Sequence, residues 1–446
     1  MTASYDLILS GGVVVSHDGI APADIGVRDG LTAAIGDLSR ADAAERIDVS
    51  RLHVLPGVID TQVHFREPGN EHKEDLEAGS RGAVLGGVTA VFEMPNTSPL
   101  TTTPASLEDK LTRAKNRMWC DHAFYVGATG ENAEELAELE QLPGCCGVKI
   151  FMGASTGDLL TEDDATLRRV LQGLRRRCAV HAEDEPRMRA RKHLAEEAAH
   201  PSAHPEWRDA QSALIATQRL VALAREVGRR VHVLHITTAD EMRFLAQNKD
   251  IASVETTPQH LTLSAPDCYE TLGTRAQMNP PIRTKEHTEG LWWGVTQGVV
   301  DVIGSDHAPH TLEEKARPYP TSPSGMPGVQ TLVPLLLDHV NQGRLSMLRF
   351  MDLTSAGAAR LFGLVRKGRI AVGYEADFTV VDMHADVEIT DAMMANKSGW
   401  TPFAGRRVSA WPKMTIIRGR TVMRDGELAN AAEGIPLRFG DTLRPA

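Results

Sequence analysis

Three histidines and one aspartate each end a short apolar run of the sequence: His64, His181, His235 and Asp306. Such runs are typical of buried strands, and the carboxyl ends of parallel barrel strands meet at one face. A single histidine at such a place is usually a hydrogen-bonding partner. Three imidazoles and a carboxylate at one face, however, suit zinc or a similar divalent ion. The four residues together therefore predict a metal centre.

A lysine, Lys149, lies inside another apolar run, "GVKIFM". Burying an unpaired ammonium group is costly, so by default such a lysine extends to solvent or pairs with an acid. Beside a metal it could instead react with carbon dioxide. The resulting carbamate is a carboxylate and can bridge two ions.

Polar residues that follow these runs could bind a substrate. Arg66 lies two positions after His64, so an extended chain directs both side chains the same way, and its guanidinium fits a carboxylate. A salt bridge with a neighbouring glutamate is the alternative. Asn96, in "EMPNT", and Asn279, in "MNPPIR", could bind amide or carboxylate oxygens, or could form turns beside proline.

The stretch "GSDHAPHTLEEK" adds His307 and His310 beside the aspartate. One of them could orient that aspartate or contact a substrate. Residues 320–332, "PTSPSGMPGVQTL", are rich in Pro, Gly and Ser and precede a helical pattern. They predict either a loop that covers a substrate or a plain connection.

Eight apolar runs alternate with helical patterns in which apolar residues recur at spacings of three and four. This alternation predicts an α/β fold with parallel strands, and eight units predict a (β/α)8 barrel. The predicted strands are residues 54–65, 88–94, 122–128, 147–152, 178–182, 231–236, 251–256 and 300–306.

The two ends of the chain show short strand patterns separated by Gly and Asp-Gly turns. Neither end contains enough strands to close a sheet core alone. We therefore expect a small β-sandwich domain composed of both termini, residues 1–53 plus 365–446, and a barrel domain over residues 54–364.

Composition excludes several classes of protein. The 446 residues carry a formal net charge of -11 and a pI of about 5.9, and no basic tract offers sites for phosphates, so we expect no nucleic-acid partner. No apolar run reaches the length of a membrane helix, and the N-terminus lacks the features of a secretory signal. We expect a cytoplasmic protein without a membrane partner. The five cysteines form no C-x-x-C pair and predict no thiolate zinc site.

Four of these motifs, "HFREPG", "EMPNT", "MNPPIR" and "GSDHAPHTLEEK", resemble those of the amidohydrolase superfamily in order and distance. Within it they are most similar to dihydroorotases of the bacterial type, which includes the dihydroorotase domains of multifunctional pyrimidine-synthesis proteins. "GSDHAPH" alone would leave allantoinases and dihydropyrimidinases open. The arginine of "HFREPG" together with the asparagine of "MPNT" favours a substrate that bears a carboxylate.

The resemblance implies a zinc-dependent cyclic amide hydrolase that reversibly closes N-carbamoyl-L-aspartate to L-dihydroorotate in pyrimidine synthesis. By motif match, the metal ligands are His64, His181, His235 and Asp306, with Lys149 as a carbamylated bridge; Arg66, Asn96, Asn279 and His310 hold the substrate; and Asp306 is the general acid and base. The family also suggests a homodimer and an association with aspartate transcarbamoylase.

One position departs from the family. The usual signature is D-x-H-x-H, whereas this chain has Asp60-Thr61-Gln62-Val63-His64. Gln62 offers at most an amide oxygen, which is a weaker zinc ligand than imidazole. The site could therefore hold two zinc ions with one unusual ligand, or a single ion. Two further alternatives are another cyclic amidase, such as an allantoinase or hydantoinase, and a non-catalytic partner of aspartate transcarbamoylase.

Overall fold

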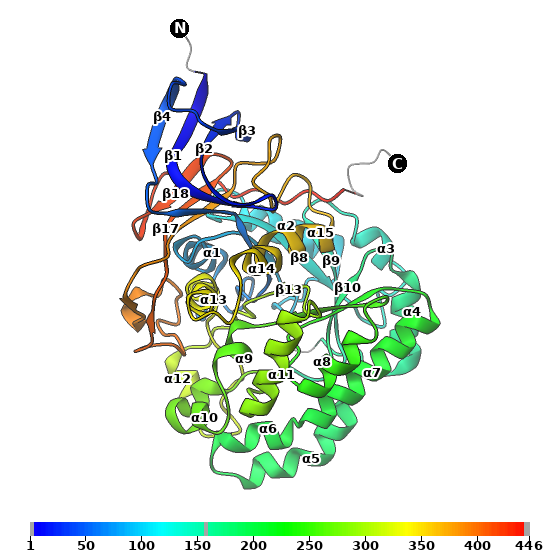
Figure 1. Cartoon of the computed structure of the whole chain (residues 1–446). Coiled ribbons are helices and arrows are strands. Elements are labelled where there is room, and N and C mark those ends of the chain that lie inside the picture. The colour runs from blue at the N-terminus through cyan, green and yellow to red at the C-terminus, as the bar shows by residue number, and fades with distance from the viewer. Residues whose placement is uncertain (1–3, 156–158, 441–446) are drawn as a thin grey trace.

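The computed structural model describes residues 4–155 and 159–440. Its main body is a barrel of parallel strands surrounded by helices, and a second sheet lies at one end of it (Figure 1). The barrel strands pair in chain order, and they are β6 (Val58–Val63), β7 (Val88–Glu93), β8 (Asp121–Gly127), β9 (Cys145–Phe151), β10 (Cys178–His181), β11 (Val231–Val233), β12 (Ala252–Thr256) and β13 (Val302–Ile303). The predicted (β/α)8 barrel is confirmed.

The barrel closes between its first and last strands. Val63 forms a parallel bridge with His307, and the His64 amide donates to the His307 carbonyl at 2.7 Å. The Ser305 amide also donates to the Asp60 carboxylate at 2.9 Å. These bonds bring the segments that carry His64 and Asp306 side by side, although the two residues are far apart in the sequence.

The predicted strand over residues 54–65 is wrong in one respect, because the chain divides it in two at Gly57. β5 (His53–Pro56) pairs with strands of the second sheet, and only β6 belongs to the barrel. A side chain at Gly57 would collide with Thr89 and Asp377, so the chain passes between the two sheets where only glycine fits. The sequence pattern did not indicate the break, because the residues on both sides of it are apolar.

Most of the longer helices begin at a capping side chain. Asp75 accepts from the Ala78 amide at the start of α1 (Leu76–Leu85), and Thr103 forms a capping box at the start of α2 (Pro104–Ala114). The remaining helices are α3 (Leu136–Leu139), α4 (Asp164–Gly173), α5 (Glu185–Glu197), α6 (His204–Trp207), α7 (Ala210–Glu226), α8 (Ala239–Ala246), α9 (Pro258–Thr262), α10 (Asp267–Leu272), α11 (Lys285–Thr296), α12 (Leu312–Lys315), α13 (Leu332–Asn341), α14 (Met347–Met351) and α15 (Gly357–Phe362). Among the described residues, no helix combines the length and the apolar character needed to cross a membrane.

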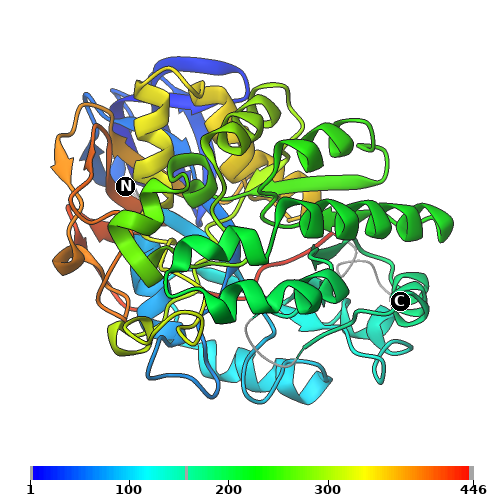
Figure 2. The same cartoon turned by 90° about the horizontal axis from the view of Figure 1, so that it is seen from below.

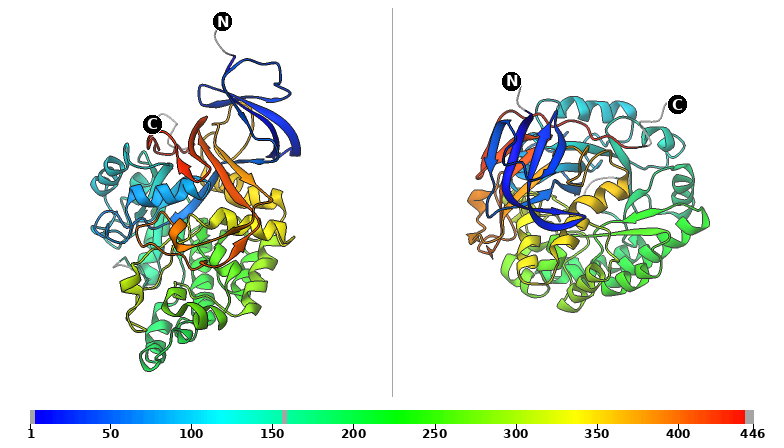
Figure 3. Two further views of the ribbon diagram at one scale, coloured as in Figure 1. Left: turned by 90° about the vertical axis from the view of Figure 1, so that its left-hand side faces the viewer. Right: turned by 45° about the horizontal axis from the view of Figure 1, so that its top comes forward.

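The second sheet draws its strands from both ends of the chain and projects beyond the barrel (Figure 3). From the N-terminal end come β1 (Tyr5–Ser16), β2 (Gly19–Arg28), β3 (Leu31–Gly36), β4 (Ala43–Asp48) and β5; from the C-terminal end come β14 (Phe378–Asp382), β17 (Trp411–Ile417), β18 (Arg420–Arg424) and β19 (Glu427–Leu428). β5 and β14 pair at its centre, which joins the two halves. A separate hairpin consists of β15 (Val387–Glu388) and β16 (Arg407–Val408).

A buried ion cluster ties the second sheet to the barrel. The Lys367 ammonium lies 2.6 Å from the Asp121 carboxylate at the start of β8, 2.7 Å from Glu375 and 2.6 Å from Asp377. Arg418 also contacts Asp121. These three carboxylates could by composition hold a metal ion, but the ammonium of Lys367 already occupies their centre. We therefore interpret the cluster as a structural ion pair.

Candidate active site

The carboxyl ends of the barrel strands enclose a cavity of about 20 Å³. It is lined by Gln62, His64, Arg66, Asn96, Lys149, Phe151, Ser155, His181, His235, Asn279, Asp306, Ala308, Ser324 and Gly325. Every predicted metal ligand lies on this cavity, and so do three of the four predicted substrate-binding residues. His310 lies behind Arg66 and is not part of the lining.

Two of the imidazoles contact each other, and the third contacts the aspartate. The Nδ1 atom of His181 is 3.1 Å from the Nε2 atom of His235, and the Nε2 atom of His64 is 3.2 Å from the Asp306 carboxylate. Burial lowers the pKa of all three histidines, so they are neutral at physiological pH. Neutral imidazoles with converging nitrogens are the form that binds a metal ion.

Two side chains beside the histidines fix which nitrogen faces the cavity. The Nδ1 atom of His64 is 2.7 Å from the Asn96 amide oxygen, and the Nε2 atom of His181 is 2.9 Å from the Glu183 carboxylate. Each contact leaves the other ring nitrogen directed at the cavity, an arrangement common behind metal-bound histidines. Asn96 therefore orients His64, a role that its place in a Pro-flanked loop did not reveal.

Glu183 was missed by the sequence analysis. It is fully buried, and the guanidinium of Arg208 contacts both of its oxygens, with Nε 3.2 Å from each. Burial raises the pKa of Glu183, but Arg208 and His181 outweigh burial, so the pKa lies below its usual value. The only signal in the sequence was a glutamate two positions after His181, and its partner Arg208 lies on a different element.

Lys149 is buried beside these histidines, with 1% of its surface exposed. Its ammonium lies 4.4 Å from the centre of the Phe151 ring and forms no hydrogen bond or ion pair within the described chain. Burial lowers its pKa to about 7, and Asp306 and Glu255 offset this only in part. In a substantial fraction of the protein molecules this side chain is therefore an uncharged amine at neutral pH. The uncharged amine is the form that reacts with carbon dioxide.

Gln62 forms a hydrogen bond with the proposed aspartate ligand. Its amide nitrogen donates to the Asp306 carboxylate at 3.0 Å, and its amide oxygen is buried without a hydrogen-bond partner. The Nδ1 atom of His235 likewise has no partner. Buried polar atoms are rarely left unsatisfied in proteins. Together with the neutral imidazoles and the carboxylate, these atoms fit a site that holds a cation.

Arg66 lies inside the cavity and not at its rim. It is 4% exposed; its Nε atom donates to the Pro309 carbonyl at 3.2 Å, and its Nη2 atom lies 3.3 Å from the Nε2 atom of His310. The neighbouring Glu67 is instead engaged by two other arginines, Arg113 and Arg117. Burial lowers the pKa of Arg66 to about 10, so it still carries its charge at neutral pH. It is therefore a buried cation available to an anionic ligand.

Three of the site residues have left-handed backbone conformations. The φ angles are 64° for Arg66, 34° for His235 and 45° for Asp306, values that residues other than glycine seldom adopt. Strained backbone of this kind is concentrated at functional sites, where the surrounding structure enforces it. Each strained residue directly follows or closely follows a barrel strand, and the turn directs its side chain into the cavity.

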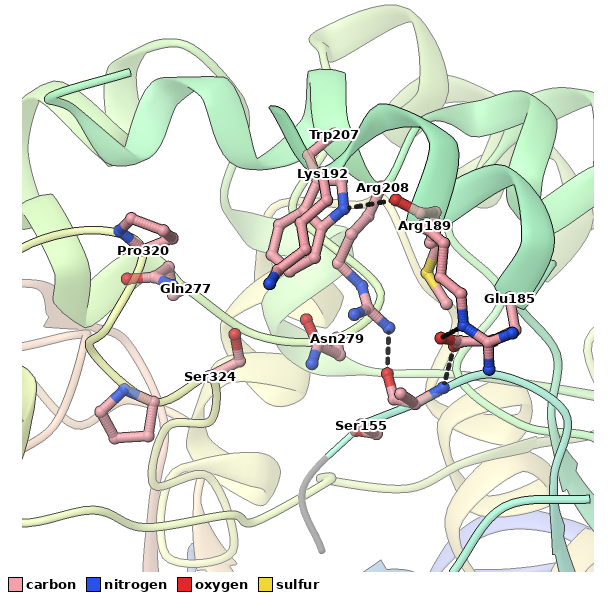
Figure 4. A pocket seen from close by; sticks show the side chains of 13 residues that line it. Ser155, Glu185, Arg189, Lys192, Trp207, Arg208, Gln277, Asn279, Pro320 and Ser324 are labelled. Carbon is pink, nitrogen blue, oxygen red and sulfur yellow. Dashed lines mark hydrogen bonds and ion pairs between the residues drawn. The ribbon is translucent and has the colours of Figure 1, made fainter. Parts of the chain in front are cut away.

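A larger cavity of about 600 Å³ leads to the small one and shares Ser155, Asn279 and Ser324 with it (Figure 4). Its far wall comes from α5 and α6, which lie over the face seen from below in Figure 2. Asn279 accepts from the ring of His204 at 3.0 Å. The loop of residues 320–332 supplies Pro320, Pro323 and Ser324 to the lining of this cavity, and its predicted role as a substrate cover stays a prediction.

The sequence profile of the amidohydrolase family matches residues 53–422. A dihydroorotase of Halobacterium salinarum is 39% identical over 86% of this chain and 89% of its own length, and an allantoinase of Rubrobacter xylanophilus is 34% identical over 97% of both chains. Among solved structures, an L-hydantoinase (dihydropyrimidinase) from Arthrobacter aurescens has a TM-score of 0.92 and 31% identity, and the match covers 97% of this chain and 100% of that one. This extent of similarity, together with the site geometry, shows that the chain belongs to the amidohydrolase family.

Proposed function

We propose that this protein is a zinc-dependent dihydroorotase, which interconverts N-carbamoyl-L-aspartate and L-dihydroorotate. The observation that carries the proposal is the buried, charged guanidinium of Arg66 in the same cavity as the neutral histidines and Asp306. A cyclic amide that bears a carboxylate would satisfy this arginine, whereas an uncharged ring would leave it unpaired. The dihydroorotases among its relatives support the same substrate.

The residues that would hold the zinc are His64, His181, His235 and Asp306. When bound, the ion would lower the pKa of a water molecule toward neutrality and polarise the carbonyl under attack. Lys149, once carbamylated, would add a carboxylate to this set and remove a positive charge from it. Its buried and partly uncharged amine supports this assignment.

Asp306 would move the proton. In ring opening it accepts a proton from the attacking water and delivers it to the ring nitrogen as the carbon–nitrogen bond breaks. In ring closure it takes the proton from the attacking nitrogen and returns it to the departing water. Arg66, Asn279 and the other residues that line the cavity would hold the ring close to Asp306, so that the proton moves over a short distance.

We further propose that the site works with one zinc ion. The Gln62 amide nitrogen donates to the Asp306 oxygen that also faces His64. This hydrogen bond occupies a lone pair of that oxygen with which a second ion would be coordinated. We expect Gln62→His to raise the zinc content from about one to about two ions per chain and to change kcat by less than about threefold. Inductively coupled plasma mass spectrometry measures the content. Two ions in the wild-type protein, or one in Gln62→His, would contradict the proposal.

A hydantoinase is the second candidate, because the match to a solved L-hydantoinase covers 97% of this chain with a TM-score of 0.92. Its substrates need no ring carboxylate, so it would give Arg66 no partner. A non-catalytic role beside aspartate transcarbamoylase is less well supported, since all other predicted ligands lie on the cavity. The homodimer, the cytoplasmic location and that association stay predictions.

The zinc-loaded protein should form dihydroorotate from carbamoyl aspartate. Ultraviolet absorbance at several pH values measures this reaction. Removal of zinc with a chelator should abolish the rate, and added zinc should restore it. Faster turnover of allantoin or hydantoin would favour the second candidate. Absence of turnover with every one of these compounds would overturn the proposed enzyme function.

A further inference from the structure

A third cavity, of about 260 Å³, lies at the opposite end of the barrel from the active site. It is lined by Cys146, Arg176, Arg177, Arg360, Leu361, Phe362, Gly363 and Gly440. Cys146 lies at the start of β9 and Arg177 directly precedes β10, so the cavity is at the amino ends of the strands. In Figure 1, α15 marks this end of the barrel, and α5 and α6 mark the other.

Arg177 is half-buried in this cavity without a carboxylate partner. Within the described chain its only hydrogen bond runs from Nη1 to the Val231 carbonyl at 3.5 Å. Burial lowers its pKa, Asp301 offsets this only in part, and Arg230 adds a like charge. Asp301 is itself paired with Lys249. A guanidinium taken partly out of water with so little compensation favours an anion beside it.

Two more arginines line the cavity, and of these Arg360 adds to the positive charge. Arg360 contacts Asp352 at 3.0 Å, but Arg349 contacts the same carboxylate at 2.6 Å. Arg176 donates to the Cys145 carbonyl at 2.8 Å and lies over the Phe439 ring at 5.0 Å. Among the described residues that line the cavity, none is acidic. This local excess of cations occurs in a protein whose net charge is -11.

We propose that this cavity binds the phosphoryl group of a small phosphorylated metabolite. Guanidinium forks bind phosphate oxygens in pairs, and Arg177 and Arg360 line the cavity from two different segments of the chain. Leu361 and Phe362 offer an apolar surface to the carbon skeleton beside the phosphate. The volume lies below the roughly 300 to 1,000 Å³ of sites for drug-sized ligands, which indicates a compact ligand.

Isothermal titration calorimetry of the full-length protein with inorganic phosphate, at constant ionic strength, tests the proposal. We expect phosphate to bind with an affinity at least about tenfold lower in Arg177→Gln, since that variant loses a charge-assisted hydrogen bond. Arg360→Gln, at an exposed position, should weaken binding as well and decides the matter if Arg177→Gln does not fold. Circular dichroism establishes the fold of each variant.

Two controls locate the binding. Arg243→Gln, on the surface of α8, should leave the affinity unchanged, and so should Arg66→Gln, which removes the buried arginine of the active site. Absence of phosphate binding to the wild-type protein would overturn the proposal. Unchanged affinity in both Arg177→Gln and Arg360→Gln would do so too, as would a loss seen only in Arg66→Gln. None of these results depends on whether the protein is a dihydroorotase.

Discussion

Replacement of Asp306 by asparagine should lower kcat for dihydroorotate by a factor of roughly 10² to 10⁴, the range that general acid–base catalysis contributes. The amide keeps the size of the side chain but cannot accept the proton from the attacking water. Asparagine keeps one oxygen that can still accept from the Gln62 amide nitrogen and face the Nε2 atom of His64, so the variant removes the charge and the proton acceptor while keeping these contacts.

The assay for Asp306→Asn compares kcat at saturating substrate with zinc content, because the residue is also a proposed zinc ligand. Asp338→Asn is a matched control: Asp338 is similarly buried, at 5% against 6% exposed, but lies on α13 away from the cavity. It should change stability more than kcat. Retention of more than about a tenth of the wild-type kcat in Asp306→Asn would show that another group carries the proton.

Replacement of Lys367 by methionine should lower the free energy of unfolding by about 3 to 5 kcal/mol, as expected when one partner of a buried ion pair is removed. Three buried carboxylates would lose the cation they share. Burial lowers the pKa of Lys367, but these carboxylates outweigh it, so the pKa lies above its usual value and the side chain is charged in the folded state. Methionine keeps the length and removes the charge.

Urea denaturation followed by circular dichroism measures this loss. Adding Asp121→Asn to Lys367→Met should recover part of the stability, because one uncompensated charge is removed, although Arg418 then loses its contact. Lys413→Met, whose ammonium forms a partly exposed pair with Asp425 at 3.3 Å, is the control and should cost less than about 1 kcal/mol. An equally small effect of Lys367→Met would contradict the structural role of the cluster.

The barrel and the residues that line its cavity could be predicted because their signals are local. Apolar runs that end in His, Asp or Arg mark the strand ends, and the barrel geometry brings those ends together. His64, His181, His235, Lys149 and Asp306 therefore line one cavity as expected from their positions alone. The closure of the barrel between β6 and β13 explains why residues so distant in sequence meet.

Features that depend on pairs of distant residues could not be predicted in this way. Glu183 forms an ion pair with Arg208, and Lys367 forms one with Asp121. The residues next to Glu183 and Lys367 in the sequence do not indicate these distant partners. The break at Gly57 could not be predicted, because it depends on the close approach of Thr89 and Asp377 in the folded chain. The role of Asn96 behind His64 is likewise a property of two loops that meet only in the folded chain.

The central claim is that Arg66 selects a carboxylated ring. The measurement is the ratio of kcat/KM for dihydroorotate to that for dihydrouracil, which lacks the carboxylate, in the zinc-loaded wild type and in Arg66→Gln. We expect a wild-type ratio above about 100, since a site built for a charged group rejects the analogue that lacks it, and a ratio near one in the variant. A wild-type protein that opens dihydrouracil as readily as dihydroorotate would contradict it.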